Sequence, residues 1–282
     1  MRTLFRYCLL AGLFISLGPA TAQNHIWFPR VAPEGKNIVN TRIDNQSYWR
    51  HLIDKGLVEA NPYLVTEQAV PTGTIIRGDG FFAQDSPDVP VTADPNTTQS
   101  ENSVFVDPLT GDISLNSNNS TDWTGATVNQ LFGADYFSTQ DAGATWTGSK
   151  NGAGQGNSGD PTTAIGRNGR WFVGKIANSW GQNVAYSDDQ GQTWIDVISG
   201  PGPGGYNILD KNHLWIDNGE SSPFEGHLYN AWTSFISGDP SEGQIQVVRS
   251  TDNGLSWSAP VIVSAAVNAG SHNQGVNIQT GP

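Results

Sequence analysis

Four short polar clusters contain the residues of this chain whose types could carry chemistry. Their members are carboxylates, a lysine, a histidine and amides, namely Glu101, Asp160, Asp210, Lys211, His272, Asn273 and Gln274. A carboxylate can act as a general acid, a general base or a cation ligand, and a lysine can pair with a substrate carboxylate. Side-chain amides can orient sugar hydroxyls. The plainer interpretation is that these residues cap strand ends and satisfy one another, as the neighbours Asp210 and Lys211 would.

A metal centre has little support in the sequence. His213 and His272 are too far apart to form a spaced pair of metal ligands, and the chain has a single cysteine. Calcium binding in the manner of an EF-hand would need a 12-residue loop that ends in Glu. The sequence therefore predicts no metal site and no cofactor, and it leaves a structural calcium ion open.

Another set of carboxylates recurs in a fixed pattern. Three octets, 139–146, 187–194 and 250–257, fit Ser/Thr-x-Asp-x-Gly-x-x-Trp. Their shared residues are Asp141, Gly143 and Trp146, then Asp189, Gly191 and Trp194, then Asp252, Gly254 and Trp257. The glycine can take a positive φ, the aspartate can accept N–H groups across a turn, and the tryptophan can bury apolar area. These properties would suit a tight turn that fastens the fold, whereas the aspartates alone could also be catalytic acids or metal ligands.

Each octet lies inside a unit of four expected strands. The strands are 103–108, 112–118, 131–139 and 145–150 in the first unit, 161–167, 170–177, 182–189 and 193–199 in the second, and 213–218, 227–235, 245–251 and 256–264 in the third. A fourth unit opens at 275–282. Only 14% of the residues are charged and 33 are glycine, which is typical of short strands joined by tight turns.

The octets resemble the Asp-box, or BNR repeat, and the units resemble blades of sialidase-like β-propellers. The resemblance covers about residues 100–282. It implies an all-β propeller of four-stranded antiparallel blades, at about 100–152, 158–200 and 210–264, with an incomplete blade at 273–282. Propellers use about four to eight blades. The chain is therefore expected to be a fragment.

The resemblance also implies where the polar clusters lie. In a propeller the loops that lead into the innermost strands form one mouth of the central channel, and the four clusters fall at such positions. They are expected to converge there. The resemblance implies that each Asp-box is the turn between the third and fourth strands of a blade, on the outer rim. The octets are therefore expected to fasten the fold, in preference to a catalytic or metal-binding role. The tryptophans and the tyrosine beyond the octets either pack between blades or stack on sugars; they are Trp171, Trp180, Tyr206, Trp215 and Trp232.

Sialidases hold the sugar carboxylate with three arginines and use a tyrosine nucleophile, a glutamate and an acid/base aspartate. Their Arg-Ile-Pro motif is missing here, and the segment around Arg30 has the wrong order. Arg167 and Arg170 flank an expected strand turn, and Arg249 lies on an expected third strand. None is placed at the mouth. No catalytic residue is therefore transferred from the sialidases.

The first 22 residues are typical of a secretory signal peptide. Arg2 and Arg6 precede a short apolar run, and residues 20–22, Ala-Thr-Ala, predict cleavage after Ala22. The apolar run is too short for a membrane span of about 20 residues. Residues 23–99 form a lead-in with one expected helix at 47–62 and a strand at 73–79. The protein is expected to be secreted or on the cell surface.

The chain is strongly acidic, with a formal net charge of −12. This charge argues against nucleic acid and anionic membranes as partners, because phosphate binding needs clustered Lys and Arg. An extracellular glycan or glycoprotein is the expected partner. Two functions stay open, since a fold does not decide an activity. One is a glycoside hydrolase of exo-α-sialidase type or a close relative, and the other is a non-catalytic propeller scaffold that binds glycan or protein.

Overall fold

The computed structural model describes residues 56, 89–92, 97–124, 127–267 and 272–281. The expected signal peptide, the helix at 47–62 apart from residue 56, the strand at 73–79 and Arg30 lie outside the described residues. The described residues form strands and turns without any helix. They accordingly include none with the length and hydropathy needed to span a bilayer.

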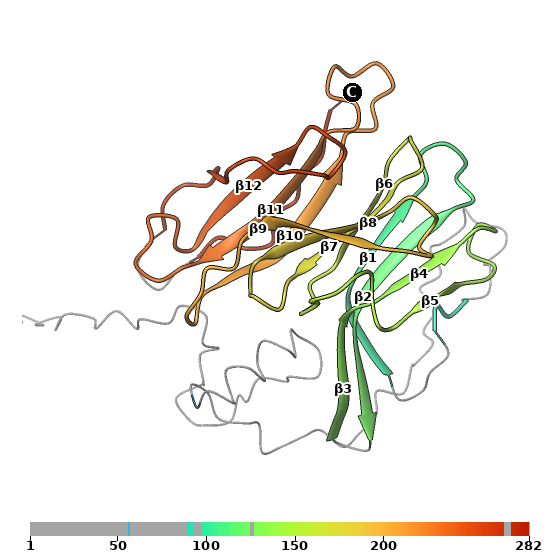
Figure 1. The fold of residues 1–282 in the computed structure, drawn as a ribbon, viewed down its shortest axis with the longest axis horizontal. Coiled ribbons are helices and arrows are strands. Elements are labelled where there is room, and N and C mark those ends of the chain that lie inside the picture. Colours follow the sequence, from blue (N-terminus) through green and yellow to red (C-terminus); the bar gives the residue numbers. More distant parts are fainter. Residues whose placement is uncertain (1–55, 57–88, 93–96, 125–126, 268–271, 282) are drawn as a thin grey trace, which may run out of the picture.

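Three antiparallel sheets follow one another along the chain (Figure 1). The second sheet contains, in order, β6 (Thr162–Ile165), β7 (Trp171–Ile176), β8 (Gln182–Ser187) and β9 (Ile195–Gly200). The third contains β10 (Ile208–Ile216), β11 (Leu228–Phe235), β12 (Gln244–Ser250) and β13 (Val261–Ile262). In both sheets each strand pairs with the next one along the chain, as in a blade of a propeller. The predicted fold class is confirmed.

The first sheet contains one strand more than predicted. Its strands are β1 (Thr97–Val106), β2 (Ser114–Thr124), β3 (Thr127–Ala134), β4 (Tyr136–Thr139) and β5 (Thr147–Ser149). The sheet order is β1-β2-β4-β5, and β3 pairs with the distal half of β2. The prediction of one strand at 131–139 is wrong, because the chain breaks at Asp135, whose buried carboxylate accepts the backbone N–H of Asn118 at 2.7 Å. The ends of β2 and β3 project from the sheet (Figure 1).

The first strand of each sheet lies innermost. The inner strand of the second sheet, β6, contacts the inner strands of the other two sheets, β1 and β10. Ser103 Oγ of β1 lies 3.2 Å from Thr163 Oγ1 of β6, and Thr162 Oγ1 donates to the carbonyl of Asn212 on β10 at 3.1 Å. The three sheets fan out from these inner strands, so the described chain is part of a β-propeller.

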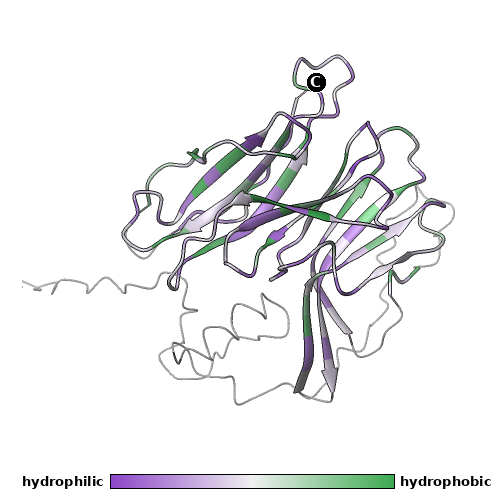
Figure 2. Ribbon diagram, in the orientation of Figure 1, coloured by the Kyte–Doolittle hydropathy of each residue, from purple (hydrophilic) through white to green (hydrophobic). Residues whose placement is uncertain are grey.

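Apolar side chains fill the space between neighbouring sheets, and Figure 2 shows hydrophobic residues along the strands. Trp171 packs with Leu115 between the first and second sheets, and Phe172 packs with Leu214 between the second and third. Trp171 and Trp232 are fully buried, so these two aromatic residues belong to the core. Burial of each large side chain stabilises the fold by roughly 1.5–3 kcal/mol.

Residues 272–281 run beside β10 as an extended segment without regular strand pairing. The backbone N–H of Ile278 donates to His213 Nδ1 at 3.2 Å, and Trp215 Nε1 donates to Thr280 Oγ1 at 3.1 Å. The segment therefore occupies the inner position next to the third sheet, where the incomplete fourth blade is expected. The regular strand expected there is not formed.

Candidate functional site

Each sheet has two distinct ends. The bulge end is where the inner strand begins, and the turn end carries the octets. At the bulge end the inner strands β1 and β10 contain the same irregularity, in which two residues oppose one on the partner strand; these are Glu101 and Asn102 on β1, and Lys211 and Asn212 on β10. In the second sheet Asp160 and Pro161 take the corresponding place, in the loop between the Asn157–Ala177 bridge and β6. A β-bulge of this kind bends a strand and re-aims its side chains.

The first residue of each of these three pairs has a left-handed backbone. The φ angles are 52° at Glu101, 52° at Asp160 and 51° at Lys211. Glycine is the residue that normally occupies such a position, because a Cβ atom is disfavoured there. Trp180, in the turn between β7 and β8 at the same end, has a φ of 63°. Left-handed residues also occur in the octets, at Ala142, Gln190 and Asn253, so the backbone alone does not distinguish the two ends. The bulge end is the candidate site because its polar side chains come from all three sheets.

Side chains from the bulges of β1 and β10 and from the loop before β6 meet. Lys211 Nζ lies 3.3 Å from Glu101 Oε1. Asn119 of β2 donates through Nδ2 to Glu101 Oε2 at 2.5 Å and to Asp160 Oδ1 at 3.4 Å. Asp160 Oδ2 accepts the backbone N–H of Lys211 at 3.1 Å, and the N–H of Asp160 donates to Asn119 Oδ1 at 2.9 Å. Glu101, Asn119, Asp160 and Lys211, called the axial cluster below, therefore join all three sheets.

The members of the axial cluster differ in exposure. Asp160 is 3% exposed, whereas the side chains of Glu101 and Lys211 are 17% and 36% exposed. Burial lowers the pKa of Lys211, but Asp160, Glu101 and Asp210 outweigh it and raise that pKa above its ordinary value. Lys211 is therefore held in its charged form by three surrounding carboxylates. Gln274 joins the same region, since its Nε2 donates to Asp210 Oδ2 at 2.7 Å.

The expectation that the clusters lie in loops is wrong for three residues. Glu101, Asp210 and Lys211 lie within strands, because β1 begins at Thr97 and β10 at Ile208 and both strands keep pairing beyond their bulges. Asp160 does lie in a loop.

Two of the predicted site residues point elsewhere. Asn273 Nδ2 donates to Ser264 Oγ at 3.2 Å and to the carbonyl of Ala265 at 3.2 Å, and the His272 ring packs 5.3 Å from that of Phe235. Both residues therefore contact the third sheet, because the backbone N–H of Asn273 is tied to the carbonyl of Gly243 at 2.7 Å. The other five predicted residues lie in or beside the axial cluster.

Sequence reasoning missed Asn119, and it placed Asn212 in a polar cluster without giving it a role; both residues hold the bulge end in place. Asn212 is buried and its Nδ2 donates to Gln182 Oε1 at 2.8 Å. The available signal for Asn119 is the run 114–120, Ser-Leu-Asn-Ser-Asn-Asn-Ser, where an inward-facing strand would normally carry apolar residues. Such a run of buried polar side chains requires hydrogen-bond partners, and therefore points to a polar junction.

A buried carboxylate lies next to this junction. Asp135 is fully buried at the bulge end of the first sheet. It accepts hydrogen bonds from the backbone N–H of Asn118 at 2.7 Å, from Ser120 Oγ at 2.5 Å and from Gln99 Nε2 at 2.8 Å. Burial raises the pKa of Asp135 to about 6, although these hydrogen bonds act in the opposite direction. Asp135 can therefore change its charge in mildly acidic solution.

The octets at the turn end have one shared geometry. In the second octet, Asp189 Oδ1 accepts the backbone N–H of Thr193 and the hydroxyl of Ser187, both at 2.8 Å, and its Oδ2 accepts the Thr193 hydroxyl at 2.6 Å. Asp141 and Asp252 make the same contacts in their own octets. Sequence reasoning missed the hydroxyl at the seventh position of the pattern, although Thr, Thr and Ser occupy it.

The pKa of Asp141 and of Asp189 is lowered to about 2, and that of Asp252 is lowered as well. The cause is the hydrogen bonds that each carboxylate accepts from the hydroxyl and the backbone N–H of the seventh residue of its octet and from the hydroxyl of the first. The left-handed backbone extends over two residues and not over the glycine alone, since φ is 56° at Gln190 and 85° at Gly191. The octet aspartates are thus acceptors within their own turns.

Each of the last two octets also contacts the sheet before it. Tyr136 of the first sheet donates through its hydroxyl to the carbonyl of Gly191 at 2.9 Å, and its ring meets that of Trp194 edge-on at 5.1 Å. Arg170 of the second sheet donates to the carbonyl of Asn253 at 2.8 Å. The octet tryptophan is only partly buried, so part of the fastening comes from these backbone carbonyls.

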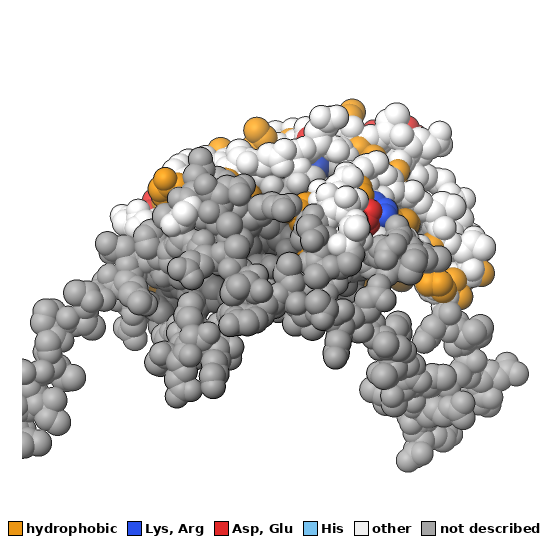
Figure 3. Space-filling model, turned by 90° about the horizontal axis from the view of Figure 1, so that it is seen from below, with side chains coloured by type: hydrophobic (Ala, Val, Ile, Leu, Met, Phe, Trp, Pro, Cys, Tyr) orange, Lys and Arg blue, Asp and Glu red, His pale blue; other side chains and the backbone are white. Residues whose placement is uncertain are grey.

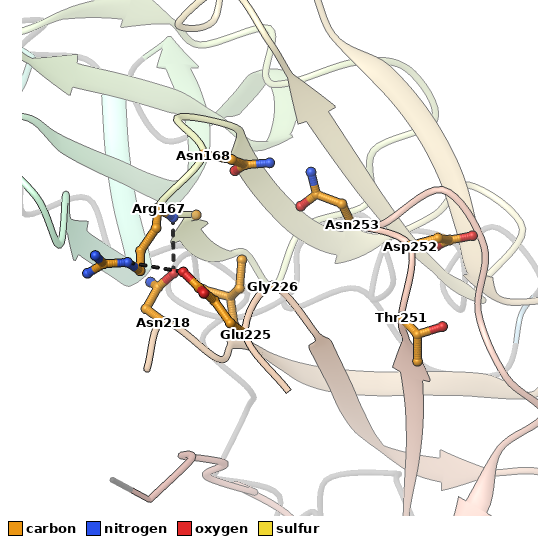
Figure 4. A pocket seen from close by; sticks show the side chains of 10 residues that line it. Arg167, Asn168, Asn218, Glu225, Gly226, Thr251, Asp252 and Asn253 are labelled. Atoms are coloured by element: carbon orange, nitrogen blue, oxygen red, sulfur yellow. Dashed lines mark hydrogen bonds and ion pairs between the residues drawn. The ribbon is translucent and has the colours of Figure 1, made fainter. Parts of the chain in front are cut away.

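A cavity of about 330 Å³ lies at the turn end, between the β6–β7 turn, the β10–β11 loop and the third octet (Figure 4). Arg167 Nε lies 3.2 Å from Glu225 Oε1, and the backbone N–H of Arg167 donates to Asn218 Oδ1 at 3.1 Å. None of the polar clusters predicted from the sequence lines this cavity. The axial cluster is the stronger candidate, because it joins three sheets and contains polar residues predicted from the sequence.

Charged side chains are sparse on the described surface that Figure 3 shows, where uncharged residues dominate. Within the described ranges no three His, Cys, Asp or Glu side chains are grouped as metal ligands. The arginines of those ranges lie away from the axial cluster. Arg167 and Arg170 belong to the β6–β7 turn at the turn end, and Arg249 is exposed on β12. The axial cluster therefore offers carboxylates, one ammonium group and amides.

Comparison with protein-family models finds no match, and comparison with curated proteins finds none. Among solved structures, an α-L-arabinofuranosidase from Fusarium graminearum is similar at a TM-score of 0.42 and 16% identity, over 64% of this chain and 52% of that chain. An α-L-arabinanase from Penicillium chrysogenum gives 0.41 and 13%, over 62% and 51%. A sialidase from Streptococcus pneumoniae gives 0.41 and 10%, over 63% and 41%. The chain thus spans about half of the first two proteins. Likeness of this degree carries no argument about activity.

Proposed function

We propose that this chain belongs to an exported, glycan-directed Asp-box β-propeller and that the axial cluster is its ligand site. The observation that carries the proposal is the convergence of Glu101, Asp160 and Lys211, three left-handed residues at the inner edge of three consecutive sheets. Hydrogen bonds between hydroxyls and ionised groups are roughly twice as strong as those between neutral groups, so such a cluster suits a ligand rich in hydroxyls. Export follows from the signal peptide expected at residues 1–22.

The axial cluster has reachable members and supporting ones. Glu101 and Lys211 are partly exposed and can meet a ligand, whereas Asp160 and Asn119 are buried and hold them in place. Asp210 and Gln274 extend the polar surface beside Lys211. A binding site needs this division, because contact residues keep their geometry only when a second layer fixes them.

Glycoside hydrolysis is the catalytic form of this proposal. Glu101 Oε2 and Asp160 Oδ1 lie 2.5 and 3.4 Å from the same nitrogen of Asn119, so these oxygens are closer together than the carboxyl groups of inverting glycosidases, which are about 6.5–9.5 Å apart. Such closeness favours a retaining mechanism, with Glu101 as the carboxylate nearer to the sugar because it is the more exposed. The exo-α-sialidase type has the weakest support, since the arginines of the described residues lie elsewhere.

A non-catalytic scaffold is the second candidate. The observation that favours it is that the Asp160 carboxylate already accepts hydrogen bonds from Asn119 and Lys211. A carboxylate engaged in this way fixes the bulges and transfers no proton. The surface around Glu101 would then bind glycan or protein without turnover.

The test uses the full chain in two parallel measurements. Turnover is measured with a fluorogenic sialoside and a fluorogenic α-L-arabinofuranoside, and binding is measured on an immobilised glycan panel. Turnover that is lost in Glu101→Gln and kept in Glu220→Gln would establish the hydrolase, because Glu220 is an exposed carboxylate at the turn end. Binding without turnover would establish the scaffold. The absence of both would overturn the glycan-directed proposal.

A further inference from the structure

The only cation of the axial cluster is already engaged. Lys211 Nζ lies 3.3 Å from Glu101 Oε1, and the backbone N–H of Lys211 donates to Asp160 Oδ2 at 3.1 Å. Asp210 precedes it in the chain and also acts on its charge. The sequence alone suggests that Lys211 pairs with a substrate carboxylate. The structure instead places a carboxylate of the protein in that position.

Other cations of the described ranges are engaged in ion pairs or lie far from the cluster. Lys150 pairs with Asp122 at 2.9 Å, and Lys175 is fully buried against Asp196 at 2.8 Å. Arg167 and Arg170 form their ion pairs at the turn end, and Arg249 is exposed on β12. The described part of the site therefore combines one ammonium group with three carboxylates, those of Glu101, Asp160 and Asp210.

This balance of charge discriminates between ligands. A glycan that carries a carboxylate would bring a further negative charge toward a site with an excess of carboxylates, and such juxtaposition opposes binding. The opposition is felt over about 8–10 Å at ordinary salt concentrations. An uncharged glycan avoids the repulsion, and its hydroxyls can donate to Glu101 and Asp210 in charge-assisted hydrogen bonds.

We infer that the axial cluster selects uncharged glycans over glycans that carry carboxylates, with Lys211 serving as an internal counter-ion that positions Glu101. The inference rests on the proposed function and narrows its substrate class. It assigns the discrimination to the local charge of Glu101, Asp160 and Asp210 and not to the net charge of the whole chain. Lys211 is accordingly a positioning residue.

The test is a binding panel of neutral oligosaccharides, each accompanied by its sialylated or uronic-acid counterpart. Dissociation constants are measured for the full chain at low and at high salt. We expect the neutral member of a pair to bind at least about tenfold more tightly at low salt, with a smaller ratio at high salt because ions screen the repulsion. Equal or tighter binding of the acidic members overturns the inference and leaves the proposed function standing. Absence of binding to every member overturns both.

Two matched variants locate the discrimination. Glu101→Gln removes one negative charge while keeping an oxygen that can accept from Asn119, so the preference for the neutral member should fall by roughly threefold or more. Glu220→Gln changes the net charge by the same amount at the turn end, where the Glu220 side chain is 84% exposed, and should leave the ratio unchanged. An equal change in both variants would assign the preference to overall charge and overturn the local assignment. Thermal melting shows whether each variant is folded.

Discussion

The carboxylates at the two ends of the sheets differ in their exposure to solvent and in the location of their hydrogen-bond partners. At the turn end, Asp141, Asp189 and Asp252 are solvent-accessible, bond within their own octets and have lowered pKa values. At the bulge end, Asp135 and Asp160 are buried and accept hydrogen bonds from other strands or other sheets. The same side chain thus completes a local turn at one end and a long-range junction at the other. The turn end therefore concerns folding, whereas the bulge end can also concern a ligand.

The largest expected effect on stability is that of removing the Asp160 carboxylate at the bulge end. Asp160→Ala removes the acceptor that ties Lys211 to the second sheet, takes this partner from the part-buried backbone N–H of Lys211 and removes a carboxylate that faces the Lys211 ammonium group. We expect the free energy of unfolding to fall by about 3 kcal/mol. Chemical denaturation measures the change. A loss below about 1 kcal/mol would show that the bulge junction contributes little to the fold.

The pH dependence of stability tests the difference in pKa. The pKa of Asp135 is raised to about 6 in the folded protein, so as the pH rises the Asp135 carboxyl loses its proton at a lower pH in the unfolded protein than in the folded one. Stability should therefore fall by about 2–3 kcal/mol between pH of about 4 and about 6 and then level off. The lowered pKa of Asp141 and Asp189, about 2, acts in the other direction, and their contribution is lost as the pH falls from about 4 toward 2.

The corresponding measurement compares urea midpoints across this pH range for the wild type and Asp135→Asn. The variant cannot ionise at position 135, so its stability should no longer fall between pH of about 4 and about 6. An unchanged slope in the variant would assign the dependence to another group.

Within the turn end, two glycines of the same pattern should differ. A Cβ atom at Gly191 would lie 3.1 Å from Tyr136 Cε2, whereas one at Gly143 would meet nothing within 4 Å. Both glycines have a positive φ. Gly191→Ala should therefore cost about 2 kcal/mol, and Gly143→Ala about 1 kcal/mol for the backbone alone. Equal losses in thermal unfolding would argue that the contact with the preceding sheet is unimportant.

The smallest effect concerns Lys211. Its ion pair with Glu101 is partly exposed, so Lys211→Met should change the free energy of unfolding by less than about 1 kcal/mol. The same variant frees Glu101 and should weaken glycan binding, which separates ligand binding from stability. A variant that lost stability and kept binding would reverse the role assigned to this residue.

Sequence patterns predict the turn end well because the relevant partners are neighbours in the chain. Asp189 and Thr193 are four residues apart and recur at the same spacing in all three octets. The second sheet forms close to the predicted ranges for the same reason. In the third sheet, β10 begins five residues before the strand expected at 213–218, and β13 covers only Val261–Ile262 of the strand expected at 256–264. The break at Asp135 was not predictable in this way, because it depends on a partner, Asn118, that is 17 residues away.

The bulge end is less accessible to sequence reasoning. The polar types of Glu101, Asp160 and Lys211 indicate a site, but their left-handed backbone has no signal in the sequence, since glycine normally marks such positions. Asn273 and His272 look equivalent to these residues by alignment of the units and still contact the third sheet. Their direction depends on the contact of the backbone of Asn273 with Gly243, which no spacing predicts.

The contacts of the octets with neighbouring sheets point backward along the chain. The second octet is held by Tyr136 and the third by Arg170, each a residue of the preceding sheet. A unit that emerges from the ribosome therefore contacts residues that have already been synthesised. If the order of the units in the chain were changed, the second and third octets would lose their contacts with Tyr136 and Arg170.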